Sequence, residues 1–466
     1  MFETIVNELN NALYSYVLII LLVLGGLYFT VRTRFAQFRL LGQQLKAVTE
    51  KTDKNGVSSF QALMVSTASR VGTGNIIGVA TALCMGGFGS VFWMWVIAII
   101  GAASAFVEST LAQIYKKRGK DGCYGGPAHY IEAATKRKWL AIVFSVFLIL
   151  TYGFGFNMLA SFNLQSTFAS YSFYNATYTP WIIGFVVAAL VGYCLIGGGK
   201  RIISVTSFLV PVMGALYIIV AVVITAINFK LLPDIFKQIF AGAFDFKAIF
   251  GGFSGSCVMY GIKRGLFSNE AGVGSAPNAS ASADVSHPAK QGLVQTLSVF
   301  IDTLLVCSAT AFMCMTSGVT PPTSSDLAAS YVQEALGKTL GQAGPVFITV
   351  AMILFAFTTL LGNLFYVDKS INYLLGKEPT KAVRNVYYVV ASLVILVGAG
   401  LSADLLWGVA DVMMGGMTLI NMPVILYLGK YAIRALNNYE KQMKRGGEIT
   451  FRSEDVDLPH ETDYWN

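Results

Sequence analysis

Charged side chains are scarce in this sequence. Its 466 residues include 33 Lys or Arg and 25 Asp or Glu, which together make 12%, about half the roughly 25% usual in soluble domains. A chain with so few charges cannot cover a large core with a hydrated surface, so a soluble enzyme, a nucleic-acid-binding protein and a disordered chain are excluded. The net charge of +8 is instead interpreted as basic topology signals on cytoplasmic loops.

Histidine and cysteine are also sparse. The three histidines, His129, His287 and His460, lie far apart, and the six cysteines form no C-x-x-C pair. We therefore expect neither a zinc site nor a disulfide framework. The sequence has no Walker motif, so ATP is not expected to drive the protein. It also offers no nucleophile and base set, which disfavours an intramembrane enzyme.

Apolar residues make up 55% of the chain and gather in long runs. Because lipid offers no partner for backbone polar groups, such runs predict membrane-spanning helices of about 20 residues. We therefore predict an all-α integral membrane protein with about 11 transmembrane helices. The predicted spans are 14–31, 60–86, 90–114, 139–162, 180–197, 203–228, 250–283, 293–317, 345–366, 386–401 and 405–428.

Lys and Arg alternate between rich and poor loops along the chain. They are plentiful after spans 1, 3, 9 and 11 and few or absent after spans 2, 4, 8 and 10. Two follow span 5 and one follows span 7, whereas the three lysines after span 6 are partly offset by two aspartates. By the positive-inside rule this predicts an external N-terminus and a cytoplasmic C-terminus. An odd number of spans requires opposite termini, so the two inferences agree. A multi-pass protein of the cell membrane is expected.

Two of the predicted spans are interrupted by glycine and polar residues. Span 2 holds Gly72, Gly74 and Gly78 near Ser69 and Asn75, and span 7 has a similar cluster before a proline. The two lie five spans apart and run in opposite directions, which predicts an inverted five-plus-five repeat with two broken helices. We divide the chain into 1–59 (a peripheral helix and loop), 60–228 and 229–429 (the two repeats) and 430–466 (a cytoplasmic tail).

Five motifs give a resemblance to a known family. They are RVGTGNIIGVATA from Arg70, RGLFSNEAGVGSAP from Arg264, FWMWV from Phe92, GGPA from Gly125 and FAFTTLLG from Phe355. The chain resembles the alanine or glycine:cation symporters (the sodium:alanine symporter family) over its whole length. The resemblance implies a LeuT-type fold and uptake of alanine or glycine with sodium, without an organic cofactor. A monomer is expected to be sufficient.

One residue departs from the pattern of that family. Asn363 follows Gly362 where the family commonly has tryptophan. A small amide in place of an indole could admit a larger polar side chain, so a sodium-coupled glutamine symporter is an alternative. A proton-coupled carrier and a channel are further alternatives. A channel would favour rings of like residues or a repeated filter.

A zwitterionic substrate needs two opposite environments. Backbone amides at the start of a half-helix suit its carboxylate, and unwound carbonyls suit its ammonium group. We expect the carboxylate at the break of span 2, the ammonium group near Phe267 and Ser268, and aromatic walls from Phe156 and Phe267. The predicted substrate residues are Gly72, Thr73, Gly74, Asn75, Phe156, Phe267, Ser268, Thr359 and Asn363.

Sodium prefers hard oxygen ligands, and span 9 carries the adjacent hydroxyls of Thr358 and Thr359. The resemblance implies a sodium ion between this helix and the break of span 2, with the carbonyls of Ala68 and Val71 as further ligands. The alternative is that both hydroxyls bond the carbonyls of their own helix.

Ionisable residues inside the membrane are functional candidates by default. Arg264 and Glu270 flank the break of span 7 and could form a gate pair. Glu108 lies near the cytoplasmic end of span 3 and could pair with a basic loop residue. Asp302 in span 8 has no obvious partner in the sequence, and Arg70 must reach a carboxylate or water.

Overall fold

The structure is a computed structural model that describes residues 2–50, 56–119, 122–245, 249, 252, 256–458 and 462–465. His460 and five of the first six residues of the predicted run 250–283 lie outside the described residues. Within the described residues, nine helices are long and apolar enough to cross a membrane. They are Thr4–Arg32, Gly89–Ile114, Lys138–Ser166, Thr179–Ile196, Gly198–Ile227, Pro288–Met315, Ala343–Leu375, Lys381–Gly398 and Ala403–Arg445.

These nine helices coincide with nine of the eleven predicted spans, and the other two predicted spans are the interrupted ones. In the structure the first long helix comprises α1 (Phe2–Ala12), η1 (Leu13–Val17) and α2 (Leu18–Arg32). The others are α7 (Gly89–Ile114), α9–η3–α10 (Lys138–Leu148, Ile149–Gly155, Phe156–Ser166), α11 (Thr179–Ile196), α12 (Gly198–Ile227), α17–η6–α18 (Pro288–Val299, Phe300–Cys307, Ser308–Met315), α20 (Ala343–Leu375), α21 (Lys381–Gly398) and α22 (Ala403–Arg445).

The interrupted spans are built from shorter pieces. The first consists of α5 (Ser59–Arg70), η2 (Gly74–Gly78) and α6 (Val79–Gly86), and the second of α15 (Cys257–Asn269) and α16 (Pro277–Ser280). The remaining short helices are α3 (Ala36–Arg39), α4 (Leu41–Val48), α8 (Pro127–Thr135), η4 (Phe229–Leu231), α13 (Leu232–Ala243), η7 (Ser325–Leu327), α19 (Ala328–Leu340) and η8 (Ser453–Val456).

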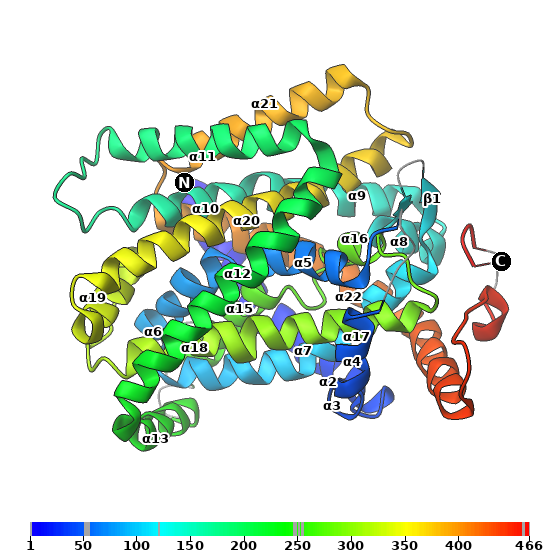
Figure 1. Cartoon of the computed structure of the whole chain (residues 1–466), viewed down its shortest axis with the longest axis horizontal. Helices are drawn as coiled ribbons and strands as arrows, with labels where there is room; N and C mark the ends of the chain where they lie inside the picture. The colour runs from blue at the N-terminus through cyan, green and yellow to red at the C-terminus, as the bar shows by residue number, and fades with distance from the viewer. Residues whose placement is uncertain are drawn as a thin grey trace.

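The long helices lie side by side along the longest axis of the molecule. Figure 1 shows α13 and α19 toward one end of that axis, and α8, β1 and the end of α22 toward the other. The first end is the one that the Lys and Arg pattern predicts to be external. The interrupted helices α5, α6 and α15 lie among the long ones (Figure 1), and nearly all their residues are buried.

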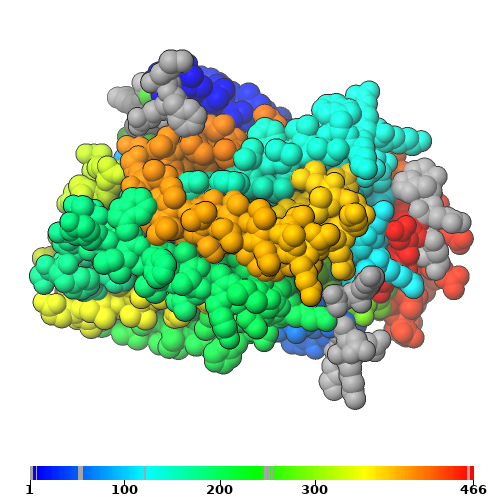
Figure 2. Space-filling view, turned by 90° about the horizontal axis from the view of Figure 1, so that it is seen from above, coloured from blue at the N-terminus to red at the C-terminus, as the bar shows by residue number. Residues whose placement is uncertain are grey.

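The outer helices present apolar side chains outward. Phe185 and Leu190 of α11, Leu216 of α12 and Val386 and Val389 of α21 are all exposed. Figure 2 shows α21 as a gold to orange strip on the surface of the molecule. An apolar surface of this extent on packed helices is the surface that hydrocarbon tails cover in a bilayer.

Two features were not predicted from the sequence. A short antiparallel hairpin of β1 (Lys117–Gly119) and β2 (Gly122–Tyr124) follows α7, so the all-helical prediction is right apart from these strands. In addition, α22 continues to Arg445, well past the predicted end of span 11 at 428. The boundary placed at 430 therefore falls inside a continuous helix.

The chain after α22 folds back onto the end of the bundle that the Lys and Arg pattern predicts to be cytoplasmic. Trp465 donates from its indole Nε1 to the carbonyl of Gln113 at 2.7 Å, and the Tyr464 hydroxyl donates to Asp284 at 2.9 Å. The two aromatic rings enclose the ammonium group of Lys116, with centroids at 4.8 and 3.8 Å. Burial lowers the pKa of Lys116 to about 8.

Candidate functional site

The break in the first interrupted span releases two backbone carbonyls. Helix α5 ends at Arg70, a π-helical turn, η2, begins at Gly74, and α-helix resumes in α6 at Val79. The amide of Gly72 donates to the Asn75 side chain at 2.7 Å instead of to Ala68, four residues earlier. The amide of Asn75 donates to the Gly72 carbonyl at 3.1 Å instead of to Val71. The carbonyls of Ala68 and Val71 therefore lose the partners that a continuous helix would give them.

The break in the second interrupted span has the same consequence. After α15 ends, Glu270 adopts a left-handed conformation with φ 54°, and Gly272 has φ 84°. The amide of Ala271 donates to the Asn269 side chain at 3.0 Å, and that of Gly272 lies 3.3 Å from Glu108 Oε1. In a continuous helix these two amides would donate to the carbonyls of Phe267 and Ser268. Both carbonyls are therefore left without a helical partner.

The two breaks meet at Gly74 and Phe267. A methyl group added to Gly74 would lie 2.8 Å from the Phe267 ring, so the absence of a side chain permits this approach. The Phe267 ring is held between Phe156, with centroids 4.4 Å apart, and Trp407, with centroids 4.8 Å apart. The predicted aromatic walls therefore lie together, and Trp407 adds a third.

A buried carboxylate also joins the two breaks. Asp302 accepts from Asn75 Nδ2 at 2.6 Å and from the Ser268 hydroxyl at 2.8 Å, and Thr303 donates to it at 2.7 Å. Both ends of the Asn75 amide are thus engaged within the protein. Asn75 is expected to contact substrate; within the protein its hydrogen bonds join the break of span 2 to the helix of Asp302.

Helix α20 packs against the first break with the side of the helix that carries Thr359 and Gly362. A methyl group on Gly72 would overlap the Thr359 hydroxyl, and one on Gly362 would lie 2.6 Å from the Ser69 amide. The Thr359 hydroxyl is buried and has no hydrogen-bond partner in the described part of the chain. A buried hydroxyl without a partner is costly, so this position favours a ligand oxygen or cation.

Thr358 points elsewhere. Its hydroxyl donates to the Leu354 carbonyl of its own helix at 3.0 Å and lies 3.4 Å from the sulfur of Met213 in α12. The structure therefore brings Thr359, but not the side chain of Thr358, to the break beside Gly72. Thr73 faces a different neighbour, Asn163, whose amide donates to its hydroxyl at 3.3 Å.

Asn363 lies in a network of polar side chains. The Ser69 hydroxyl is 2.7 Å from Asn363 Oδ1 and 2.9 Å from Glu270 Oε1, and its single proton can serve one of them at a time. Asn363 Nδ2 donates to Asn157 Oδ1 at 2.9 Å. The amide of Asn157 is buried and has no acceptor among the described residues.

The proposed gate pair of Arg264 and Glu270 is wrong. Arg264 pairs with Asp411 at 3.1 Å, whereas Glu270 accepts from Ser275 at 2.7 Å and lies near Ser69. The two side chains lie apart because Glu270, the first residue after α15, has a left-handed backbone that turns the chain away from the helix axis.

The other buried charges also have internal partners. Glu108 is fully buried and accepts from Asn421 Nδ2 at 2.9 Å, so it does not reach a basic loop residue. Arg70 donates to the Gln295 side chain at 2.9 Å, while its Nε and Nη2 have no partner within the described residues. Its positive charge attracts the carboxylates of Glu108, Glu270 and Asp302.

Sequence reasoning missed three residues of this region. Asp411 is an ionisable residue inside an apolar run, and the rule that singled out Asp302 would also have found it. Asn157 follows Phe156 inside another apolar run and carries the same kind of signal. Trp407 gave no signal, because a tryptophan in a membrane span is common.

A family model described as the sodium:alanine symporter family matches residues 1–453. The chain belongs to the sodium:alanine symporter family. It is 40% identical to the amino-acid carrier protein AlsT of Bacillus subtilis, over 98% of this chain and 96% of that protein. The match confirms the resemblance that the five motifs carry.

Two further relatives of this symporter carry different substrate names. The probable sodium/glutamine symporter GlnT of Bacillus subtilis is 40% identical over 96% of this chain and 93% of its own length. The sodium/alanine symporter AgcS of Methanococcus maripaludis is 36% identical over 94% of this chain and 98% of its own length. The family thus establishes a transporter of the sodium symport class, and its members differ in the amino acid that they are named for.

Proposed function

We propose that this protein takes up alanine or glycine into the cell together with sodium. The observation that carries the proposal is the meeting of two helix breaks, each with released backbone groups, around Gly74 and Phe267. Membership of the sodium:alanine symporter family supports it. The two broken helices also lead us to infer an inverted five-plus-five repeat of the LeuT type, divided at 60–228 and 229–429.

The substrate carboxylate is assigned to the backbone of Gly72, Thr73 and Gly74, where a half-helix begins and its dipole favours an anion. The ammonium group is assigned to the released carbonyls of Phe267 and Ser268, where another half-helix ends. Phe156 and Phe267 close the sides, and such walls suit a methyl group or a hydrogen atom better than a charged side chain. No charged side chain is needed to bind a neutral zwitterion in this arrangement.

The sodium ion is assigned to the other side of the first break. The ligands assigned here are the released carbonyls of Ala68 and Val71 and the hydroxyl of Thr359. Thr358, which the sequence also suggested, is left out of this set because its hydroxyl donates to the Leu354 carbonyl. The unpartnered Thr359 hydroxyl beside Gly72 supports this assignment most directly. One positive charge moved inward gains about 2.3 kcal/mol per 100 mV of membrane potential, so transport is electrogenic in this scheme.

Uptake of labelled alanine into proteoliposomes tests the proposal. An inward sodium gradient should drive accumulation, and an inside-negative potential should increase it. Equal uptake without sodium, under a proton gradient, would show a proton-coupled carrier. Counterflow separates a carrier from a channel, because only a carrier exchanges internal for external substrate.

The paired threonines supply a sharper test of the sodium site. Thr359→Val removes a hydroxyl without changing side-chain volume and should raise the half-saturating sodium concentration about tenfold, the effect of one lost contact to a charge. Thr358→Val is the matched control, and a smaller increase is expected because its hydroxyl already donates to Leu354. Equal sodium dependence in wild type and Thr359→Val would remove Thr359 from the site.

Glutamine is the second candidate substrate. The unpartnered amide of Asn157 next to Asn363 offers a donor to the carbonyl of a glutamine side chain, and the likeness to the probable glutamine symporter agrees with this choice. Against it, both ends of the Asn363 amide already have neighbours within hydrogen-bond distance. Competition of labelled alanine uptake by unlabelled glycine and glutamine decides between the candidates.

We assign the protein to the cell membrane as a monomer, with the end that holds α13 and α19 outside. Labelling of single introduced cysteines with a membrane-impermeant reagent in intact cells tests this orientation. A cysteine in α19 should react, and one at the end of α22 should not.

A further inference from the structure

A second polar cavity lies on the predicted external side of the central site. It has a volume of about 310 Å³, and its walls include Lys263, Arg264, Asp404, Trp407 and Asp411. These residues come from α15 and α22, and Asn10 of α1 also contributes. The cavity is distinct from the meeting point of the two breaks, and the proposed function gives it no role.

The inner wall of this cavity has more positive charge than its neighbours neutralise. Lys263 and Arg264 lie 2.8 and 3.1 Å from the same oxygen of Asp411, Oδ2. Two cations therefore share one carboxylate. The side chain of Arg264 is only 3% exposed. Its Nε and Nη1 atoms are therefore shielded from water, and they have no hydrogen-bond partner among the described residues. Buried guanidinium donors without acceptors favour an added anion such as a carboxylate.

The same cavity has a free negative charge at its rim. Asp404 lies in the first turn of α22, is exposed, and accepts from the Ser325 hydroxyl at 2.7 Å. It precedes Asp411 by seven residues, about two helical turns or roughly 10 Å along the axis. The cavity therefore holds cations at its inner wall and a carboxylate at its rim, and the charges of Lys263, Arg264, Asp404 and Asp411 sum to zero. This pattern is complementary to a neutral zwitterion.

Only one layer of side chains separates this cavity from the central site. The guanidinium of Arg264 stacks on Trp407 at 3.9 Å from the ring centroid and lies 5.9 Å from the centroid of Phe267. The centroids of the Trp407 and Phe267 rings are 4.8 Å apart. A ligand held by Arg264 would thus lie directly above the aromatic wall of the proposed substrate site.

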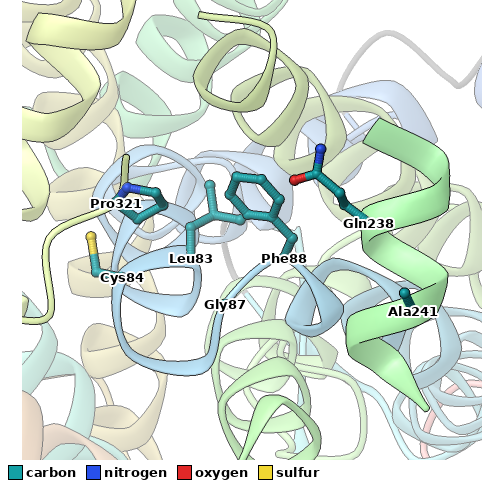
Figure 3. A pocket seen from close by; sticks show the side chains of 7 residues that line it. All are labelled: Leu83, Cys84, Gly87, Phe88, Gln238, Ala241 and Pro321. Carbon is teal, nitrogen blue, oxygen red and sulfur yellow. The ribbon is translucent and has the colours of Figure 1, made fainter. Parts of the chain in front are cut away.

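A neighbouring cavity at the same end lacks this chemistry. It has a volume of about 470 Å³ and lies between the end of α6, α13 and the loop of Pro321. Figure 3 shows Leu83, Phe88 and Pro321 at its walls, with Gln238 reaching in from α13. None of the described residues that line it is charged. It therefore has no cation for the carboxylate of a zwitterion and no anion for its ammonium group.

We propose that the cavity above Trp407 is an outer binding site for the amino-acid substrate, with the carboxylate at Arg264 and the ammonium group toward Asp404. This inference rests on the proposed function and extends it. Substrate occupies the outer site first and passes to the central site when the layer of Arg264 and Trp407 opens. Opposite charges at the two ends of the cavity would orient the substrate and raise its local concentration.

The test measures sodium-driven alanine uptake in proteoliposomes for wild type, Asp404→Asn and Asp404→Glu. Asp404→Asn should raise KM about three- to tenfold, the range of a partly exposed charge interaction, without changing the maximal rate or the half-saturating sodium concentration. Asp404→Glu should restore a KM close to that of wild type. Asp404 is exposed, so folding should be unaffected.

Asp326→Asn is the matched control. Asp326 is exposed and close enough to Asp404 to repel it, but it does not line the cavity. An equal rise of KM in both Asn variants would show a general surface-charge effect and overturn the proposal, as would an unchanged KM in Asp404→Asn. Failure of the proposed function is distinguishable, because wild type itself would then show no sodium-driven uptake.

Discussion

Replacing Gly74 by alanine tests the geometry of the site most directly. The added methyl group would lie 2.8 and 2.9 Å from two carbons of the Phe267 ring, closer than carbon atoms pack. The ring cannot move away freely, because Phe156 and Trp407 hold its two sides. Overpacking of this kind costs about 1–3 kcal/mol. If the closed, substrate-bound state bears this cost, alanine affinity falls about 5- to 150-fold.

Gly78→Ala is the matched control for this variant. It lies four residues further along the same broken span, where the added methyl group would meet Trp407 at an ordinary 3.5 Å. The backbone of Gly78 is helical, with φ −64°, so alanine should also favour the helix by about 1 kcal/mol. Gly78→Ala should therefore keep wild-type affinity and be at least as stable.

The assay is equilibrium binding of labelled alanine to purified protein in sodium, together with thermal unfolding without substrate. The double variant Gly74→Ala with Phe267→Leu should recover part of the affinity, because the smaller side chain relieves the overlap. Wild-type affinity in Gly74→Ala would refute the reasoning, since the two breaks would then not need to approach each other to bind substrate.

Two further predictions concern buried polar groups outside the central site. Burial lowers the pKa of His287 to about 3. Between pH 6.5 and this value the unfolded chain binds a proton that the folded chain does not, so the free energy of unfolding falls as the pH is lowered. At pH 5 the loss should reach about 2 kcal/mol, and His287→Asn, which can still accept from the Ala289 amide, should abolish that part of the pH dependence of thermal unfolding. Asp411→Asn should cost about 3–5 kcal/mol of stability, because two buried cations lose their common carboxylate; an equal midpoint of unfolding in this variant and wild type would contradict it.

The sequence was sufficient to locate the spans and the breaks. Apolar runs have a length that the bilayer imposes, and glycine with polar neighbours in such a run conflicts with a continuous helix. For this reason α5 ends at Arg70 and α15 ends at Asn269, where the clusters predicted unwinding. Hydropathy does not detect the part of a helix that leaves the lipid, so the continuation of α22 to Arg445 was not predicted.

The partners of the buried charges could not be predicted from the sequence. Arg264 and Asp411 are separated by 147 residues, and Asn75 and Asp302 by 227. No local spacing relates such residues, and their pairing depends on how the helices pack. The suggested pair of Arg264 and Glu270 shows the risk. Glu270 is near Arg264 in the sequence, but its own left-handed backbone at the end of α15 places its carboxylate beside Ser69 instead.

The folded-back segment after α22 has a consequence for biosynthesis. Gln113 and Trp465 are separated by 352 residues, so α7 enters the membrane long before Tyr464 and Trp465 are translated. During that interval Lys116 lacks its two aromatic neighbours, and a lysine beside a membrane span is the kind of residue to which the positive-inside rule refers. Once the later segment arrives, the same charge lies against two aromatic rings. The surroundings of Lys116 therefore depend on the last residues of the chain to be made.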